Sequence, residues 1–147
     1  MKGKKKRSLQ TKAVKTLVDG IQFQSKIEAY TYLALKKAGI EADYEKHSYI
    51  LIQGFTSDVE VWANIQGVFR GRFNKIRPIV YTPDFVDPHQ RWIIEVKGRK
   101  FADFMMRWKL FIGHLTKSEI NSCLYLVCNK AEVDSAIKDI KQQIQKE

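Results

Sequence analysis

This 147-residue sequence has few cysteines, no long hydrophobic run and no acidic residue near its N-terminus. It contains two cysteines, Cys123 and Cys128, within one apolar run. No further cysteine lies nearby, so neither a disulfide-stapled miniprotein nor a zinc site is expected. We interpret both as reduced core residues of an intracellular protein, because disulfides are rare in the cytosol. No apolar run reaches the roughly 18–20 residues that span a bilayer, and we expect neither a membrane partner nor a signal peptide.

The remaining composition is that of an ordinary globular protein. Hydrophobic residues make up 44% of the chain, which excludes global disorder and a collagen-like chain. Residues 1–18 lack a sustained apolar periodicity, which predicts a mobile basic arm. The length predicts a single domain over residues 19–147, with an inserted segment at about 53–78.

Positive charge is concentrated at the N-terminus. The chain has 26 Lys and Arg against 16 Asp and Glu, a net charge of +10. Seven of the basic residues lie in the first fifteen positions and no acid precedes Asp19, so the arm carries +7. A strong positive field indicates a polyanionic partner, which inside a cell is usually nucleic acid. The alternative is a solubilising tail. In the arm, the predicted DNA contacts are Lys4, Lys5, Lys6 and Arg7.

Hydrophobic spacing predicts the order helix, strands, helix, strand, helix, which is an α/β fold with a central mixed β-sheet flanked by helices. A capping box from Ser25 to Glu28 and a glycine at position 39 predict a helix over 25–38. The other predicted helices cover 100–113 and 130–143. The predicted strands cover 42–52, 79–86, 92–96 and 120–127, the last buried on both faces. Asp87 is expected in the turn between two strands that form a hairpin.

Basic residues also recur in the body of the chain. Those of the inserted segment alternate with Phe69, Phe73 and Ile76, which is typical of a DNA-facing hairpin, although a solvated loop would read similarly. A second group surrounds the start of the predicted helix at 100–113. Together they give the predicted DNA contacts Arg70, Arg72, Lys75, Arg99, Lys100, Arg107 and Lys109.

The sequence Glu95-Val96-Lys97 is the sharpest candidate for chemistry. Residues i and i+2 of a strand face the same way, so Glu95 and Lys97 project together. The predicted hairpin register brings Asp84 near Glu95. Two close carboxylates repel unless a cation lies between them, and a hard divalent ion suits oxygen ligands. An ammonium beside them suits phosphodiester hydrolysis by a metal-held water. The alternative is an ordinary salt bridge between strands.

This arrangement resembles the restriction-endonuclease-like, or PD-(D/E)xK, superfamily of nucleases. The motif is Pro83-Asp84 followed by Glu95-Val96-Lys97, with Gly98 next. Within that superfamily the chain resembles the endonuclease I type of phage Holliday-junction resolvases. The resemblance rests also on residues 23–28 and on residues 38–40 followed by Tyr44 and Glu45, and it covers about residues 21–128.

The resemblance implies a metal-dependent endodeoxyribonuclease that acts on branched DNA in a phage-infected bacterial cell. It implies Mg²⁺ as the cofactor, with Mn²⁺ as a substitute, and a homodimer. The implied metal site consists of Asp84, Glu95 and Val96, with Lys97 assisting the water. Glu28 would be a further acid at that site, or a purely structural part of its capping box. The alternatives are a less structure-selective phage nuclease and a DNA-binding protein that does not cleave.

Overall fold

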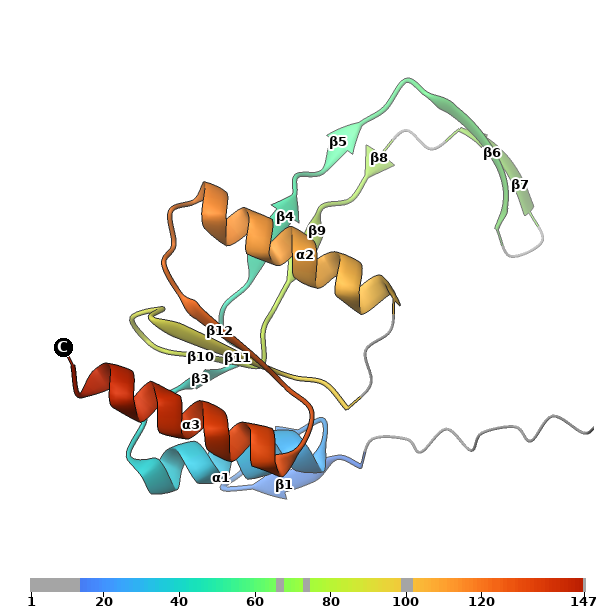
Figure 1. Ribbon diagram of the computed structural model, residues 1–147. Helices are drawn as coiled ribbons and strands as arrows, with labels where there is room; N and C mark the ends of the chain where they lie inside the picture. The colour runs from blue at the N-terminus through green and yellow to red at the C-terminus, as the bar shows by residue number, and fades with distance from the viewer. Residues whose placement is uncertain (1–13, 66–67, 73–74, 99–101, 147) are drawn as a thin grey trace, which may run out of the picture. The chain divides into compact units, whose positions relative to one another are not determined.

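The computed structural model describes residues 14–65, 68–72, 75–98 and 102–146, with the side chains of 60–74 left outside the description. In these residues the structure is mixed α/β, with three helices and a four-stranded mixed sheet (Figure 1). This confirms the predicted fold class in its general form. The chain forms two compact units, one of residues 1–40 with 128–147 and one of residues 41–127. The expectation of one domain over 19–147 did not anticipate this division.

The first unit begins with a β-hairpin. Strand β1 (Thr16–Val18) pairs antiparallel with β2 (Ile21–Phe23). The two residues between them, Asp19 and Gly20, have φ of 50° and 77°, the left-handed conformation that tight hairpin turns require and that Asp-Gly supplies readily. Strand β1 lies inside the range 1–18 predicted as a mobile arm, so that boundary is wrong. The Asp-Gly pair is the signal that was missed. Residues 1–13 lie outside the described residues.

Two helices complete the first unit. Helix α1 (Lys26–Ala38) starts after Ser25, whose Oγ accepts a hydrogen bond from the Glu28 amide at 3.2 Å. It ends at Gly39, so the predicted helix over 25–38 is confirmed. Helix α3 (Lys130–Ile144) confirms the helix predicted over 130–143. The two helices lie side by side (Figure 1). The Tyr30 hydroxyl on α1 donates to Asp134 on α3 at 2.8 Å.

The second unit contains the four-stranded sheet, in the order β12, β11, β10, β3. Strand β11 (Trp92–Val96) lies between β12 (Cys123–Val127), which is parallel to it, and β10 (Phe85–Val86), which is antiparallel. All five residues of β11 are buried. The strand predicted over 120–127 was expected to be buried on both faces, which is wrong. In β12 only Val127 is buried, because this strand is at the edge of the sheet.

Two predicted strands are each broken into two. The one over 42–52 becomes β3 (Asp43–Tyr44) and β4 (Tyr49–Ile52), separated by Glu45 with φ of 48°. The one over 79–86 becomes β9 (Ile79–Tyr81) and β10, with Pro83 in the gap. Proline has no amide hydrogen to continue the pairing. As a result β4 and β9 pair with each other, while β3 and β10 join the four-stranded sheet.

The segment between β4 and β9 folds back on itself. Strand β5 (Phe55–Thr56) pairs with β8 (Lys75–Ile76), and β6 (Glu60–Ile65) pairs with β7 (Val68–Arg72). The three antiparallel pairs β4–β9, β5–β8 and β6–β7 are nested in the sequence, and we refer to them together as the ribbon (Figure 1). The hairpin predicted in the basic part of this segment is therefore confirmed as a structure.

Helix α2 (Ala102–Lys117) supplies most of the core of the second unit. It extends beyond the predicted 100–113, since Gly113 does not end it. Its buried residues, Phe104, Trp108, Phe111 and Leu115, recur at helical spacing. They pack with Tyr49 and Tyr81 of the ribbon base and with Val86 and Ile93 of the sheet. This aromatic core fixes β9 against α2, and Asp84 lies three residues beyond the end of β9.

The turn between β10 and β11 is held by a buried carboxylate. The Asp87 side chain is 2% exposed and accepts hydrogen bonds from Arg91 Nε at 2.8 Å and from Arg91 Nη2 at 3.0 Å. The amides of His89 and Arg91 donate to it as well. Burial by itself raises the pKa of Asp87, but the hydrogen bonds and the Arg91 charge outweigh it and hold that pKa below its usual value. The prediction of Asp87 as a turn residue is confirmed.

We expect Asp87→Asn to lower the free energy of unfolding by roughly 1–3 kcal/mol at pH 7, because Asn leaves buried donors unsatisfied. A carboxyl whose pKa is depressed in the folded state stabilises the fold above its unfolded pKa of about 3.9, and this contribution is lost as pH falls through the folded pKa. Urea denaturation at pH 7 and at successively lower pH measures both effects. The exposed Asp58→Asn is the control, and equal stability of the two variants at pH 7 would contradict the assignment.

Candidate functional site

Asp84 and Glu95 lie together where β10 and β11 diverge. Phe85 is paired with Ile94, so the same register places Asp84 opposite Glu95. The Val96 amide donates a hydrogen bond to Oδ2 of Asp84 at 2.7 Å, which holds the carboxylate against the end of β11. Both acids are buried, with exposures of 7% for Asp84 and 2% for Glu95. The predicted proximity of the two carboxylates is present in the structure.

Lys97 faces the same way as Glu95, as expected for residues i and i+2 of a strand. Its Nζ lies 2.9 Å from Oε1 of Glu95 and 5.2 Å from the centre of the Phe104 ring. The lysine side chain is 35% exposed, whereas that of Glu95 is 3% exposed. An ion pair with one partner so deeply buried is unlike the exposed salt bridges that contribute little to stability. A purely surface role for Glu95 and Lys97 is therefore excluded.

The second carboxylate oxygen of Glu95 makes no hydrogen bond of ordinary geometry among the described residues. Oε2 is buried, and a buried anionic oxygen left unsatisfied is costly. The Tyr81 hydroxyl is a neighbouring donor. One oxygen of Glu95 is therefore paired with Lys97, and the other has room for a closer donor or a cation.

Glu95 and Lys97 open onto a pocket of about 430 Å³, whereas Asp84 and Val96 are not among the residues that line it. Glu95 and Lys97 reach it from β11, Tyr81 from β9, and Asp103 and Arg107 from the first turns of α2. The pocket is lined by Val80, Tyr81, Thr82, Glu95, Lys97, Asp103, Phe104 and Arg107. It thus joins two carboxylates, two cations and a phenol in one concave site, the kind of place where ligands bind.

Oxygen atoms dominate the possible ligands for a metal. No group of three His, Cys, Asp or Glu side chains gathers among the described residues. The predicted set has two carboxylates, from Asp84 and Glu95, and Val96 can add only its main-chain carbonyl because its side chain is apolar. Oxygen donors suit a hard divalent cation such as Mg²⁺ or Mn²⁺. The buried Oε2 of Glu95, which makes no hydrogen bond of ordinary geometry among the described residues, agrees with this donor set, so the residues fit the predicted cofactor.

Sequence reasoning missed Tyr81, which is 5% exposed. Burial raises the pKa of its hydroxyl most, and the charge of Glu95, a hydrogen-bonding interaction with the Glu95 carboxylate and the charge of Asp84 raise it further. Glu95 is thus the neighbouring acceptor, although among the described residues the hydroxyl makes no hydrogen bond of ordinary geometry. Asp103 was also missed, and both residues line the pocket. The available signal was position: Tyr81 precedes Pro83-Asp84 by two residues, and Asp103 lies in the first turn of the helix that follows Lys97.

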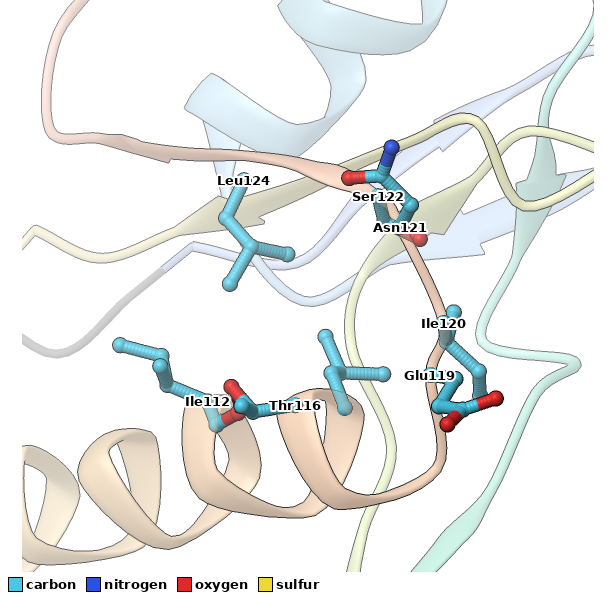
Figure 2. A pocket seen from close by; sticks show the side chains of 8 residues that line it. Ile112, Thr116, Glu119, Ile120, Asn121, Ser122 and Leu124 are labelled. Carbon is cyan, nitrogen blue, oxygen red and sulfur yellow. Dashed lines mark hydrogen bonds between the residues drawn. The ribbon is translucent and has the colours of Figure 1, made fainter.

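A second pocket, of about 350 Å³, lies between the end of α2 and the start of β12. Figure 2 shows Ile112 and Thr116 on the helix, with Ile120 and Leu124 across from them. The other side chains labelled there are Glu119, Asn121 and Ser122. Glu119 is the single ionisable group among these lining residues, so this pocket offers no pair of groups for acid–base or metal chemistry. The pocket beside Glu95 is the better candidate.

Glu28 belongs to the first unit and is described with it. It is 7% exposed. Its Oε1 accepts from the Ser25 hydroxyl at 2.8 Å, and its Oε2 accepts from the Gln24 amide at 3.0 Å. The capping box predicted from the sequence is therefore formed. Its predicted part in a metal site stays a prediction.

The residues predicted to contact DNA differ in how much of each the structure describes. Lys4, Lys5, Lys6, Arg7, Arg99 and Lys100 lie outside the described residues. Arg70 and Arg72 are on β7, and the description covers their backbone but not their side chains. Lys75 on β8 and Arg107 and Lys109 on α2 are exposed. Arg107 alone of these three lines the pocket of Glu95 and Lys97.

None of the helices in the described ranges is long and apolar enough to cross a membrane.

Comparison with known proteins gives one family. No curated protein and no solved structure matches the chain. Residues 8–132, which include both motif strands and helix α2, match the family described as "Protein of unknown function (DUF1064)". This match covers well over half of the sequence, and the chain therefore belongs to that family.

Proposed function

We propose that this protein is a metal-dependent endodeoxyribonuclease of the restriction-endonuclease-like type, acting on branched DNA such as a Holliday junction. One observation carries the proposal. Glu95 is buried, with one oxygen on Lys97 and the other without a well-formed hydrogen bond among the described residues. It lines a pocket and stands opposite Asp84, in a chain with a net charge of +10. A carboxylate pair with an adjacent ammonium suits phosphodiester hydrolysis.

Each residue has a defined part in this proposal. Asp84 and Glu95 would hold Mg²⁺ or Mn²⁺, with the Val96 carbonyl as a third oxygen. The bound ion would polarise the phosphate and lower the pKa of a water. Lys97, already fixed beside Glu95, would orient the attacking water and stabilise the negative charge that builds on the phosphate. The Val96 amide holds one oxygen of the Asp84 carboxylate in place.

The fold supports the same proposal. Residues that bear the motif lie on β10 and β11, and the chain then passes through α2 to β12, which is parallel to β11. This arrangement is what the resemblance to restriction-endonuclease-like cores implies for the strands around the metal. The exposed Lys75 and Lys109 and the basic arm would contact DNA phosphates without reading sequence.

The first test compares a labelled four-way junction with a linear duplex of matched sequence. Carboxylate ligation predicts cleavage with Mg²⁺ or Mn²⁺ and none in excess EDTA. Ca²⁺ should support binding with little cleavage. Gel assays of both substrates measure this. Equal cleavage of the two DNAs would favour a less selective nuclease, binding without cleavage in any metal would favour a DNA-binding protein, and cleavage in EDTA would contradict the metal site.

Single substitutions test the site residues. We expect Asp84→Ala, Glu95→Ala and Lys97→Ala each to lower the cleavage rate at least roughly a hundredfold, the scale of losing one charge-stabilising group. DNA affinity should survive, because the basic residues elsewhere are unchanged. Single-turnover rates and fluorescence anisotropy measure the two quantities. The control is Glu119→Gln, in the second pocket. A wild-type rate in any of the three alanine variants would remove that residue from the site.

Glu28→Gln separates the two interpretations of Glu28. A glutamine keeps one oxygen and one amide group for the Gln24 amide and the Ser25 hydroxyl, so the helix start should survive. It is a poor metal ligand, so a catalytic Glu28 predicts a rate at least roughly tenfold lower with unchanged thermal stability. Rate and melting temperature are measured together. Normal turnover would make Glu28 structural.

The predicted homodimer has support from exposed apolar side chains. Phe55 and Val59 are 54% and 67% exposed, and Ile50, Ile52, Ile76, Ile79 and Val80 are also exposed. All lie along the ribbon, which includes the inserted segment at about 53–78. Val61, Trp62 and Ile65 of that segment have side chains outside the description. We expect a dimer in sedimentation at tens of micromolar, and Phe55→Glu should dissociate it. A wild type that sediments as a monomer, both alone and on junction DNA, would contradict the dimer.

A further inference from the structure

Contacts of the Tyr81 ring hold its hydroxyl in place, and the hydroxyl itself takes no part in these contacts. The Tyr81 ring stacks on Phe111, with centroids 4.6 Å apart and planes at 25°, and packs against Trp108 at 6.2 Å. A phenylalanine would fill the same space. The hydroxyl itself is buried and has Glu95 as a neighbouring acceptor, yet among the described residues it makes no hydrogen bond of ordinary geometry, which normally lowers stability. The core therefore fixes a donor at the pocket without using it.

Arg107 brings a second donor group to the pocket. It lines the same pocket and lies near enough to Tyr81 for its charge to oppose the rise in the tyrosine's pKa. Lys97 differs, because its ammonium is already paired with Glu95. Tyr81 and Arg107 together thus present a phenolic O–H and a fork of N–H groups beside the carboxylate that would hold a cation.

We propose that Tyr81 and Arg107 form the subsite for the phosphate group of the substrate, with the hydroxyl and the guanidinium donating to its non-bridging oxygens. A phosphate oxygen is an acceptor with which the Tyr81 hydroxyl can form the well-aligned hydrogen bond that it does not make with Glu95, and an arginine fork matches phosphate geometry. The Glu95 carboxylate repels an anion, so the subsite fills only when a cation is bound as well. This inference rests on the proposed function and adds the group that positions the substrate.

The test uses Tyr81→Phe and Arg107→Gln in the full chain. The ligand is thymidine 3′,5′-bisphosphate in buffer with Ca²⁺, and calorimetry measures its affinity. Each variant should weaken binding at least about tenfold, the effect of one hydrogen bond to a charged group. Tyr81→Phe should also slow DNA cleavage. Its midpoint in urea should stay at or above that of the wild type, because an unsatisfied buried group has been removed.

Two variants provide matched controls. Tyr49 is a second buried tyrosine that packs on Phe111, at 5.0 Å, and its hydroxyl donates to Gln90 at 3.1 Å. Tyr49→Phe should lower the urea midpoint and leave ligand affinity unchanged, the reverse of Tyr81→Phe. Lys117→Gln removes an exposed cation from the last turn of α2 and should change neither quantity.

The outcomes separate this inference from the proposed function. Equal affinity in wild type and Tyr81→Phe would overturn the subsite, even if the wild type cleaves DNA. If Tyr81→Phe changed only the Mg²⁺ dependence of cleavage, the hydroxyl would act through Glu95, and the subsite would be overturned as well. A wild type that binds no thymidine bisphosphate would overturn it directly. Loss of ligand affinity in Tyr81→Phe, with no cleavage of any DNA by the wild type, would support the subsite and reject the nuclease.

Discussion

The hydrogen bond from the Val96 amide to the Asp84 carboxylate is the contact on which the candidate site depends. Strand β10 has only two residues, so main-chain pairing with β11 is short. At one end Asp84 takes over the pairing by accepting the Val96 amide at 2.7 Å. At the other end Asp87 accepts from Arg91 and from two amides of the turn. Buried carboxylates thus fix both ends of the hairpin, and one of them doubles as the candidate metal ligand.

The arrangement around Glu95 shows how a buried charge is tolerated at such a site. An isolated carboxylate inside a protein is strongly disfavoured unless it is paired. Lys97 pairs with one oxygen of Glu95 and packs its ammonium over the Phe104 ring. In the part of the chain that the structure describes, neither the other oxygen nor the neighbouring Tyr81 hydroxyl makes a well-formed hydrogen bond. Unsatisfied groups gathered in one pocket reduce stability there, and functional sites are where folded proteins retain such groups.

The aromatic core connects this pocket to the ribbon. Tyr49 and Tyr81 come from the base of the ribbon, and both pack on Phe111 of α2. The same helix carries Asp103 and Arg107 into the pocket. A single packing surface therefore sets the position of β9, of α2 and of the pocket between them. The apolar side chains that the ribbon leaves exposed lie on the same strands.

Short-range rules in the sequence determined the helices and the core motif. Ser25 and Gly39 bound α1 because capping is a local interaction, and Glu95 and Lys97 share a face because strand periodicity is two. The breaks at Glu45 and Pro83, and the edge position of β12, followed from which strands pair, and pairing is decided by contacts far apart in sequence. Tyr81 and Asp103 entered the pocket for the same reason: β9 and the start of α2 meet there only after the sheet and its aromatic core have formed.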